Sequence, residues 1–222
     1  MTTTRTPTTV LFDLDNTLCE HTTTFSDRLA AAFERVGVDP FFETADVHRW
    51  LPRVSAESAL DLREQVFGGI ARELDRDPAV ADDLAAAYVD PDPADVRLLP
   101  GARETVDALS EEYRLGLVTN GGRAVQRAKL DALDFGDAFE TSVYAGGAMP
   151  VKPDAEPFER ALSALSAAPG EALHVGDSLG SDVAGANALG LRSVWVPHAE
   201  SLREGPTPSH TIDTLHDLPD LL

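Results

Sequence analysis

The stretch that decides the fold is Val10-Leu11-Phe12-Asp13-Leu14-Asp15-Asn16-Thr17-Leu18. A short apolar run ends in two aspartates separated by one residue, and a small polar turn follows. Side chains alternate between the faces of a β-strand, so Asp13 and Asp15 point the same way at the strand's end. Two neighbouring carboxylates repel each other unless a cation or a shared proton lies between them. The pattern therefore indicates a divalent metal and acid–base chemistry, although an aspartate after a strand is also a common turn or helix-cap residue.

The composition predicts a soluble protein. The 222 residues suit one good-sized domain, or a domain that carries a smaller insertion. No apolar run approaches the roughly 20 residues that cross a bilayer, and the polar start of the chain lacks the apolar core of a secretory signal. The single cysteine, Cys19, excludes an internal disulfide and fits a reducing compartment. We therefore expect a cytoplasmic location.

The net charge of −20 excludes some partners. So acidic a surface repels nucleic acid and anionic membranes, and we expect neither as a partner. Lys129 and Lys152 are the only lysines, whereas arginine is used freely. High acidity with few lysines is typical of halophilic proteins, because at about 1 M salt the Debye length shrinks to ~3 Å and self-repulsion becomes tolerable. An ordinary acidic protein is the alternative.

Strands and helices are expected to alternate. Short apolar segments predict five buried strands, at Thr8 to Phe12, Arg114 to Val118, Thr141 to Tyr144, Ala172 to Val175 and Arg192 to Val196. Apolar residues at three-to-four spacing predict helices over Ala102 to Glu112, Arg123 to Leu133, Pro157 to Ser166 and Asp182 to Leu189. Residues 209–222 are expected to add a short edge strand and a small closing helix. This order predicts an α/β fold, a doubly wound, Rossmann-like parallel sheet covered on both faces.

The alternation has one long interruption. Between the first and second predicted strands, about a hundred residues show helical patterns, at Ser26 to Val36, Thr44 to Trp50, Ala56 to Leu74 and Ala79 to Tyr88. A crossover between parallel strands needs far fewer residues. We therefore predict an inserted all-helical cap domain at residues 19–96, and an α/β core domain at residues 1–18 and 97–222. The insertion follows Asp13 and Asp15 directly, so we expect it to lie over the strand ends as a lid.

Four polar pieces fall at one edge of the predicted sheet, where ligands bind in such folds. They are Asp13-Leu14-Asp15-Asn16-Thr17, Thr119-Asn120, Lys152-Pro153 and Gly176-Asp177-Ser178-Leu179-Gly180-Ser181-Asp182. In this order they resemble the four motifs of the haloacid dehalogenase superfamily of phosphohydrolases, and the resemblance covers almost the whole chain. The helical insertion after the first motif resembles the C1-type cap of that family.

The resemblance implies roles for the two aspartates of the first motif. Asp13 is expected to attack phosphorus and form an aspartyl-phosphate, which divides the hydrolysis into two steps. Asp15 is expected to protonate the leaving alkoxide and then to accept a proton from the attacking water.

The resemblance also implies a metal ion and a phosphate site. Mg²⁺ prefers hard oxygen ligands and keeps several waters. The expected ligands are Asp13, the backbone carbonyl of Asp15, and Asp177, with Asp182 acting through a metal-bound water. The phosphoryl oxygens are expected to be held by the Thr119 hydroxyl, the amide of Asn120 and the Lys152 ammonium.

The second aspartate also narrows the reaction. True dehalogenases of this family lack an acid at that position, so Asp15 favours a phosphatase acting on a small phosphorylated metabolite such as phosphoglycolate, a nucleotide or a sugar phosphate. A phosphomutase of the β-phosphoglucomutase type stays open, as does a non-catalytic phosphate-binding or signalling protein on the same fold. We expect a monomer or small homo-oligomer, and we expect His174 and Cys19 to be core residues.

Overall fold

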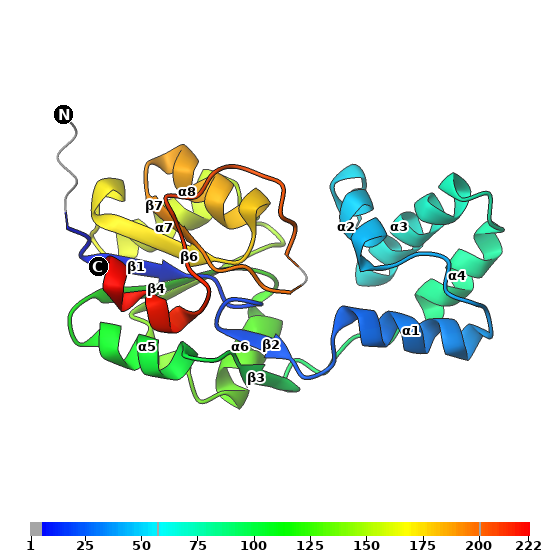
Figure 1. Ribbon diagram of the computed structural model, residues 1–222, viewed down its shortest axis with the longest axis horizontal. Coiled ribbons are helices and arrows are strands. Elements are labelled where there is room, and N and C mark those ends of the chain that lie inside the picture. The colour runs from blue at the N-terminus through cyan, green and yellow to red at the C-terminus, as the bar shows by residue number, and fades with distance from the viewer. Residues whose placement is uncertain (1–5, 57, 200) are drawn as a thin grey trace. The chain divides into compact units, whose positions relative to one another are not determined.

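Figure 1 shows a computed structural model of the chain, which describes residues 6–56, 58–199 and 201–222. Contacts divide the chain into two compact units. One consists of the residues up to Thr22 together with Pro93–Leu222, and the other consists of Thr23–Asp92. We call them the core unit and the helical unit. Over the described ranges, no helix combines the length and the apolar character that a bilayer crossing requires.

The core unit is built on a six-stranded sheet. Its strands lie in the order β5-β4-β1-β6-β7-β8, and each neighbouring pair is parallel. They are β1 (Thr9–Phe12), β4 (Arg114–Asn120), β5 (Thr141–Ala145), β6 (Ala172–Gly176), β7 (Arg192–Trp195) and β8 (His210–Thr211). The predicted α/β class with a doubly wound parallel sheet is confirmed.

Strand β1 lies inside the sheet, between β4 and β6. Its four residues are all buried, because helices cover both faces of the sheet. Val10 and Phe12 pack into the cluster on one face, and Leu11 packs into the cluster on the other. Since β4, the next strand of this sheet along the chain, lies on one side of β1 and β6 lies on the other, the strand order reverses here. The carboxyl end of β1 is therefore the switch point at which ligands bind in open α/β sheets.

Two groups of helices cover the two faces (Figure 1). One group packs with Phe12 and consists of α5 (Ala102–Ser110), α6 (Arg123–Ala132) and the 3₁₀ turns Gly136–Ala138, Leu215–Asp217 and Pro219–Leu221. The other packs with Leu11 and consists of α7 (Ala155–Ala164) and α8 (Ala184–Leu189). A 3₁₀ turn, Pro169–Glu171, leads from α7 into β6.

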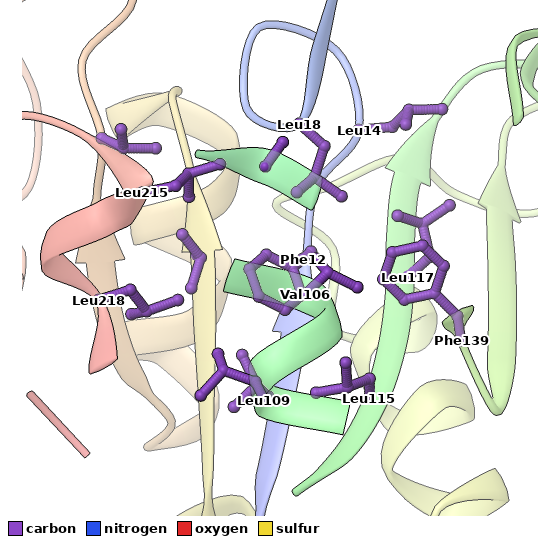
Figure 2. Packing of buried hydrophobic residues seen from close by; sticks show 14 of the residues in the cluster. Phe12, Leu14, Leu18, Val106, Leu109, Leu115, Leu117, Phe139, Leu215 and Leu218 are labelled. Atoms are coloured by element: carbon purple, nitrogen blue, oxygen red, sulfur yellow. The ribbon is translucent and has the colours of Figure 1, made fainter. Parts of the chain in front are cut away.

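Figure 2 shows the packing on the α5 face. Val106 and Leu109 of α5 lie against Phe12 of β1 and against Leu115 and Leu117 of β4. These five side chains are at most 4% exposed. Burial of each is worth roughly 1.5–3 kcal/mol relative to exposure, and their packing fixes β1 against β4.

The structure differs from the sequence prediction in three details. The helix expected from Asp182 begins earlier, with a π-helical turn at Leu179–Val183 that leads into α8. The expected closing helix consists of two 3₁₀ turns. An antiparallel ribbon of β2 (Cys19–His21) and β3 (Val96–Leu98) was not predicted. Strands of three residues are too short to show a period-two pattern.

The ribbon belongs to the core unit. Glu20 of β2 forms a 2.7 Å ion pair with Arg97 of β3, in addition to the backbone pairing of the two strands. The units therefore divide at Thr22/Thr23 and Asp92/Pro93, a few residues inside the boundaries drawn from the sequence.

The helical unit contains α1 (Phe25–Val36), α2 (Thr44–Trp50), a 3₁₀ turn (Leu51–Arg53), α3 (Ala59–Glu73) and α4 (Pro78–Ala87). Thr24, Ser58 and Asp77 cap the first, third and fourth helices, each accepting a backbone hydrogen bond through its side chain. Phe33 and Phe67 lie in a separate apolar cluster within this unit. The unit thus has a core of its own.

Close packing between α7 and α8 gives a stability prediction for Gly185→Ala. A Cβ at Gly185 would lie 2.4 Å from Cε2 of Phe158 and 3.2 Å from Cα of Pro153. Helix propensity alone predicts a gain of about 1 kcal/mol, whereas overpacking costs about 1–3 kcal/mol. We expect a net loss in the free energy of unfolding, measured by urea denaturation. Gly170→Ala, whose Cβ meets nothing within 4 Å, is the control; a Gly185→Ala variant at least as stable as the wild type would contradict this packing.

Candidate active site

The residues of the four motifs meet at the carboxyl ends of β1, β4 and β6. Asp13 follows the last residue of β1, Thr119 and Asn120 end β4, and Asp177 follows β6. Lys152 lies in the loop between β5 and α7, and Asp182 lies in the π-helical turn. Hydrogen bonds and ion pairs join these residues into one cluster, as the following distances show.

Lys152 is the centre of the cluster, and its side chain is only 1% exposed. Its Nζ lies 2.6 Å from Asp13 Oδ1, 2.7 Å from Asp182 Oδ1 and 2.8 Å from the carbonyl oxygen of Val118. An ammonium has three protons to donate, so all three are used. The two carboxylates are thereby held on either side of one buried cation.

The side chain of Asn120 fixes the backbone of Lys152. Its Oδ1 accepts a 2.8 Å hydrogen bond from the Lys152 amide, and its Nδ2 donates a 3.2 Å bond to the Lys152 carbonyl oxygen. The end of β4 and the loop after β5 are therefore joined by a two-bond clamp. The Asn120 side chain thus orients Lys152 by holding the backbone of Lys152.

Asp182 is held by three neighbours. Its Oδ1 binds His174 Nε2 at 2.9 Å in addition to Lys152, and its Oδ2 accepts a 3.1 Å bond from the Ser178 amide. A Cβ at Gly176 would lie 2.3 Å from Asp182 Cγ, so this close approach requires glycine at the end of β6. His174 is fully buried, as expected of a core residue, and its bond to Asp182 is an addition to the sequence prediction.

Three carboxylates form a candidate cation site. One oxygen each from Asp13, Asp177 and Asp182 lies within 4.8 Å of the others, and all three residues are buried. Ser201 Oγ donates a 2.7 Å hydrogen bond to Asp177 Oδ2 and so orients it. A buried group of hard carboxylate oxygens suits Mg²⁺. The side chain of Asp15 is not part of this group, because it contacts α6 instead. The metal contact expected of Asp15 is through its backbone carbonyl oxygen, and it stays a prediction.

Burial and crowding shift the proton affinities of these carboxylates. Burial raises the pKa of Asp13 to about 8; Lys152 works against this rise, and the charges of Asp182 and Asp177 add to it. Burial likewise raises the pKa of Asp177 to about 6, with a contribution from Asp182. Burial alone would also raise the pKa of Asp182, but Lys152 and His174 outweigh it and hold that pKa well below its usual range. With all three aspartates ionised, the site would hold more negative charge than Lys152 alone neutralises.

Asp15 is bound by two side chains of α6. Its Oδ1 lies 2.6 Å from Lys129 Nζ, and its Oδ2 accepts a 2.8 Å hydrogen bond from Gln126 Nε2. The same nitrogen lies 2.7 Å from Thr119 Oγ1 and 3.0 Å from the carbonyl oxygen of Asn120. Gln126 therefore connects the end of β1 with the end of β4.

Sequence reasoning missed Gln126, Lys129, His174 and Ser201 as parts of this network. Gln126 and Lys129 belong to the polar face of an amphipathic helix, which is typical of solvent exposure, yet they are 1% and 5% exposed. The scarcity of lysine was the one available signal for Lys129. Cys19 is buried as expected, and burial raises the pKa of its thiol, which makes it a poor nucleophile.

The chain is similar to known phosphatases. It is 32% identical to a ribulose-1,5-bisphosphate 5-phosphatase of Halopiger xanaduensis, over 97% of this chain and 99% of that protein. It is also 32% identical to a glyceraldehyde 3-phosphate phosphatase of Pyrococcus abyssi, over 86% of this chain and 82% of that protein. These relatives confirm the predicted enzyme class, a phosphoric monoester hydrolase.

Solved structures and sequence families agree with this similarity. A Bacillus subtilis HAD-hydrolase structure, solved bound to magnesium, superimposes with a TM-score of 0.69 at 20% identity, over 98% of this chain and 99% of that one. At this identity the likeness concerns the fold alone. Residues 7–190 match the hydrolase family described as haloacid dehalogenase-like. The chain therefore belongs to the haloacid dehalogenase-like hydrolases, as its four motifs predict.

Proposed function

We propose that this protein is a Mg²⁺-dependent phosphatase that hydrolyses a small phosphorylated metabolite through an aspartyl-phosphate on Asp13. One observation carries the proposal: the Asp13 carboxylate is bound by a buried lysine and lies within a group of three buried carboxylates. A carboxylate beside a cation and a cation site is suited to attack phosphorus, because the approaching phosphate is anionic and its charge must be neutralised.

The residues present fit a divalent cation. Asp13, Asp177 and Asp182 offer only carboxylate oxygens. Burial, to which the neighbouring carboxylates add, raises the pKa values of Asp13 and Asp177, and a bound cation would favour their ionised forms. When bound, Mg²⁺ would neutralise charge on the phosphoryl oxygens. Asp13 and Asp177 would be direct ligands, and Asp182 would support the ion through a water.

The proposed reaction has two steps. An Asp13 oxygen attacks phosphorus, the bond from phosphorus to the ester oxygen breaks, and Asp15 gives its proton to the leaving alkoxide. A water then attacks the aspartyl-phosphate and passes a proton to Asp15, and the bond from Asp13 to phosphorus breaks. Inorganic phosphate leaves, and both aspartates return to their starting states.

Thr119, Asn120 and Lys152 are proposed to hold the phosphoryl oxygens. Thr119 and Asn120 end the strand beside β1, and Lys152 already contacts the proposed nucleophile at 2.6 Å. Since all three protons of the Lys152 ammonium are used within the chain, a bond to phosphate requires one of those contacts to be exchanged. Even when all three contacts are kept, the positive charge of Lys152 reduces the repulsion between Asp13 and the anionic substrate.

The relatives support a small phosphate ester as the substrate. The relatives act, by their names, on ribulose 1,5-bisphosphate and glyceraldehyde 3-phosphate. We propose phosphoglycolate, a nucleotide or a sugar phosphate as the substrate, and the helical unit as the cap that selects it. The net charge of −20 and the presence of only two lysines support a protein that works in a salt-rich cytoplasm.

The proposal is tested with p-nitrophenyl phosphate and Mg²⁺, at low and at molar KCl. We expect turnover by the wild type, with a thermal midpoint that rises with salt, because screening reduces self-repulsion. Asp13→Asn should lower kcat on the order of 10⁴-fold or more, because the nucleophile is lost.

The control for that experiment is Asp137→Asn, which removes an exposed aspartate of the core unit and should leave kcat unchanged. An inactive wild type at salt concentrations that keep it folded would contradict the phosphatase proposal. Retained activity in Asp13→Asn would show that another group is the nucleophile.

The carboxylate pKa values predict how Mg²⁺ binding depends on pH. Without metal, folded Asp13 and Asp177 keep protons that the unfolded chain releases above about pH 4. The titration of these two carboxyls therefore lowers the stability of the metal-free protein as pH rises from about 4 to about 8. Mg²⁺ must displace these protons, so millimolar Mg²⁺ should raise Tm more at about pH 8 than at about pH 5.5. An equal rise at both pH values, or none in the wild type, would contradict the assignment of these ligands.

A further inference from the structure

The second lysine of the chain is buried beside the proposed acid–base residue. Lys129 lies on α6, and its side chain is 6% exposed. Its Nζ is 2.6 Å from Asp15 Oδ1. A buried ammonium loses hydration worth several kcal/mol unless a partner compensates for it. An apolar side chain on this helix would bury itself without that cost, so packing alone does not account for a lysine here.

Gln126 completes the arrangement from the preceding turn of the same helix. It is three residues before Lys129 and therefore on the same face. Its Nε2 donates to Asp15 Oδ2 at 2.8 Å, and the side chain is buried. Each carboxylate oxygen of Asp15 thus has its own donor on α6, and both donors belong to a helix that is packed into the core through Leu130.

A second ion pair on α6 has a different environment from the pair of Lys129 with Asp15. Arg127 binds Asp131 at 3.0 Å, one turn further on, and both side chains are more than half exposed. Exposed pairs of this kind contribute about 0–1 kcal/mol and do not fix a geometry. The buried pair of Lys129 joins α6 to the segment after β1, so it fixes the direction of the Asp15 carboxylate.

We propose that Lys129 is a positioning residue that, with Gln126, holds the Asp15 carboxylate in place for proton transfer to the leaving group. This inference rests on the proposed phosphatase function and extends it to residues outside the four motifs. General acid catalysis requires the acid within hydrogen-bond reach of the ester oxygen. Since a displacement of about 1 Å can cost on the order of 10²-fold in rate, loss of Lys129 should affect the step that Asp15 assists.

The leaving group distinguishes this role from a general effect on the fold. Benzyl phosphate releases a basic alkoxide, which needs a proton from Asp15 as the bond breaks. p-Nitrophenyl phosphate has a ring of similar size but releases a stable phenolate, which needs little proton donation. The ratio kcat/KM contains only the steps up to the first irreversible one, so hydrolysis of the aspartyl-phosphate does not enter it.

The test compares Lys129→Met with the wild type on both esters, in the full-length protein with Mg²⁺. We expect kcat/KM for benzyl phosphate to fall on the order of 10²-fold and kcat/KM for p-nitrophenyl phosphate to fall less than about 10-fold. Arg127→Met removes the neighbouring exposed cation and should leave both values unchanged. Lys129→Gln, which keeps a polar side chain, should show the same difference between esters and serves where Lys129→Met folds poorly by circular dichroism.

A second readout is the coupling between Lys129 and Asp15. In an Asp15→Asn background, adding Lys129→Met should change kcat/KM for benzyl phosphate by less than about 3-fold, because the group that Lys129 positions is already lost. Additive losses would overturn the proposal, and so would equal losses on the two esters or no loss. A wild type that hydrolyses neither ester would instead overturn the phosphatase function itself, so the two failures are distinguishable.

Discussion

The candidate active site depends on one interaction, the contact of the buried Lys152 ammonium with the carboxylates of Asp13 and Asp182. Three charged groups in a desolvated space are stable only together, since removing one partner of a buried pair costs about 3–5 kcal/mol. When Asp13, Asp177 and Asp182 are all ionised, this one cation leaves net negative charge in the site. The same imbalance that costs stability makes the site attractive to a divalent cation. The clustered carboxylates therefore explain both the arrangement of these side chains around Lys152 and the proposed binding of a metal ion.

The fold creates this interaction by bringing strand ends together. Parallel pairing of β1 with β4 and β6 places Asp13 beside Thr119 and Asp177. Close contacts then set the remaining distances: Gly176 leaves room for Asp182, and the Asn120 clamp holds the backbone of Lys152. Each of these requirements acts on a different segment of the chain, so the site is assembled only when the whole core unit has folded.

The sequence predicts those parts of the site that are coded by local patterns. An apolar run followed by aspartates indicates both a strand and its chemistry, so Asp13 and Asp177 are recognisable from their neighbours along the chain. Gln126 and Lys129 are not, because a polar helix face looks the same whether it meets solvent or a buried carboxylate. The β2–β3 ribbon was missed for a related reason, since its pairing joins three-residue segments that are far apart in sequence. Tertiary contacts decide all of these features.

The most direct test of the central claim is to find the phosphoryl group on Asp13. Wild-type protein turning over p-nitrophenyl phosphate with Mg²⁺ would be quenched in acid, digested and analysed by peptide mass spectrometry. We predict that the peptide containing Asp13 gains the mass of one phosphoryl group, and that the gain disappears without substrate. Phosphorylation of a different residue during normal turnover would contradict the role of Asp13 as the nucleophile.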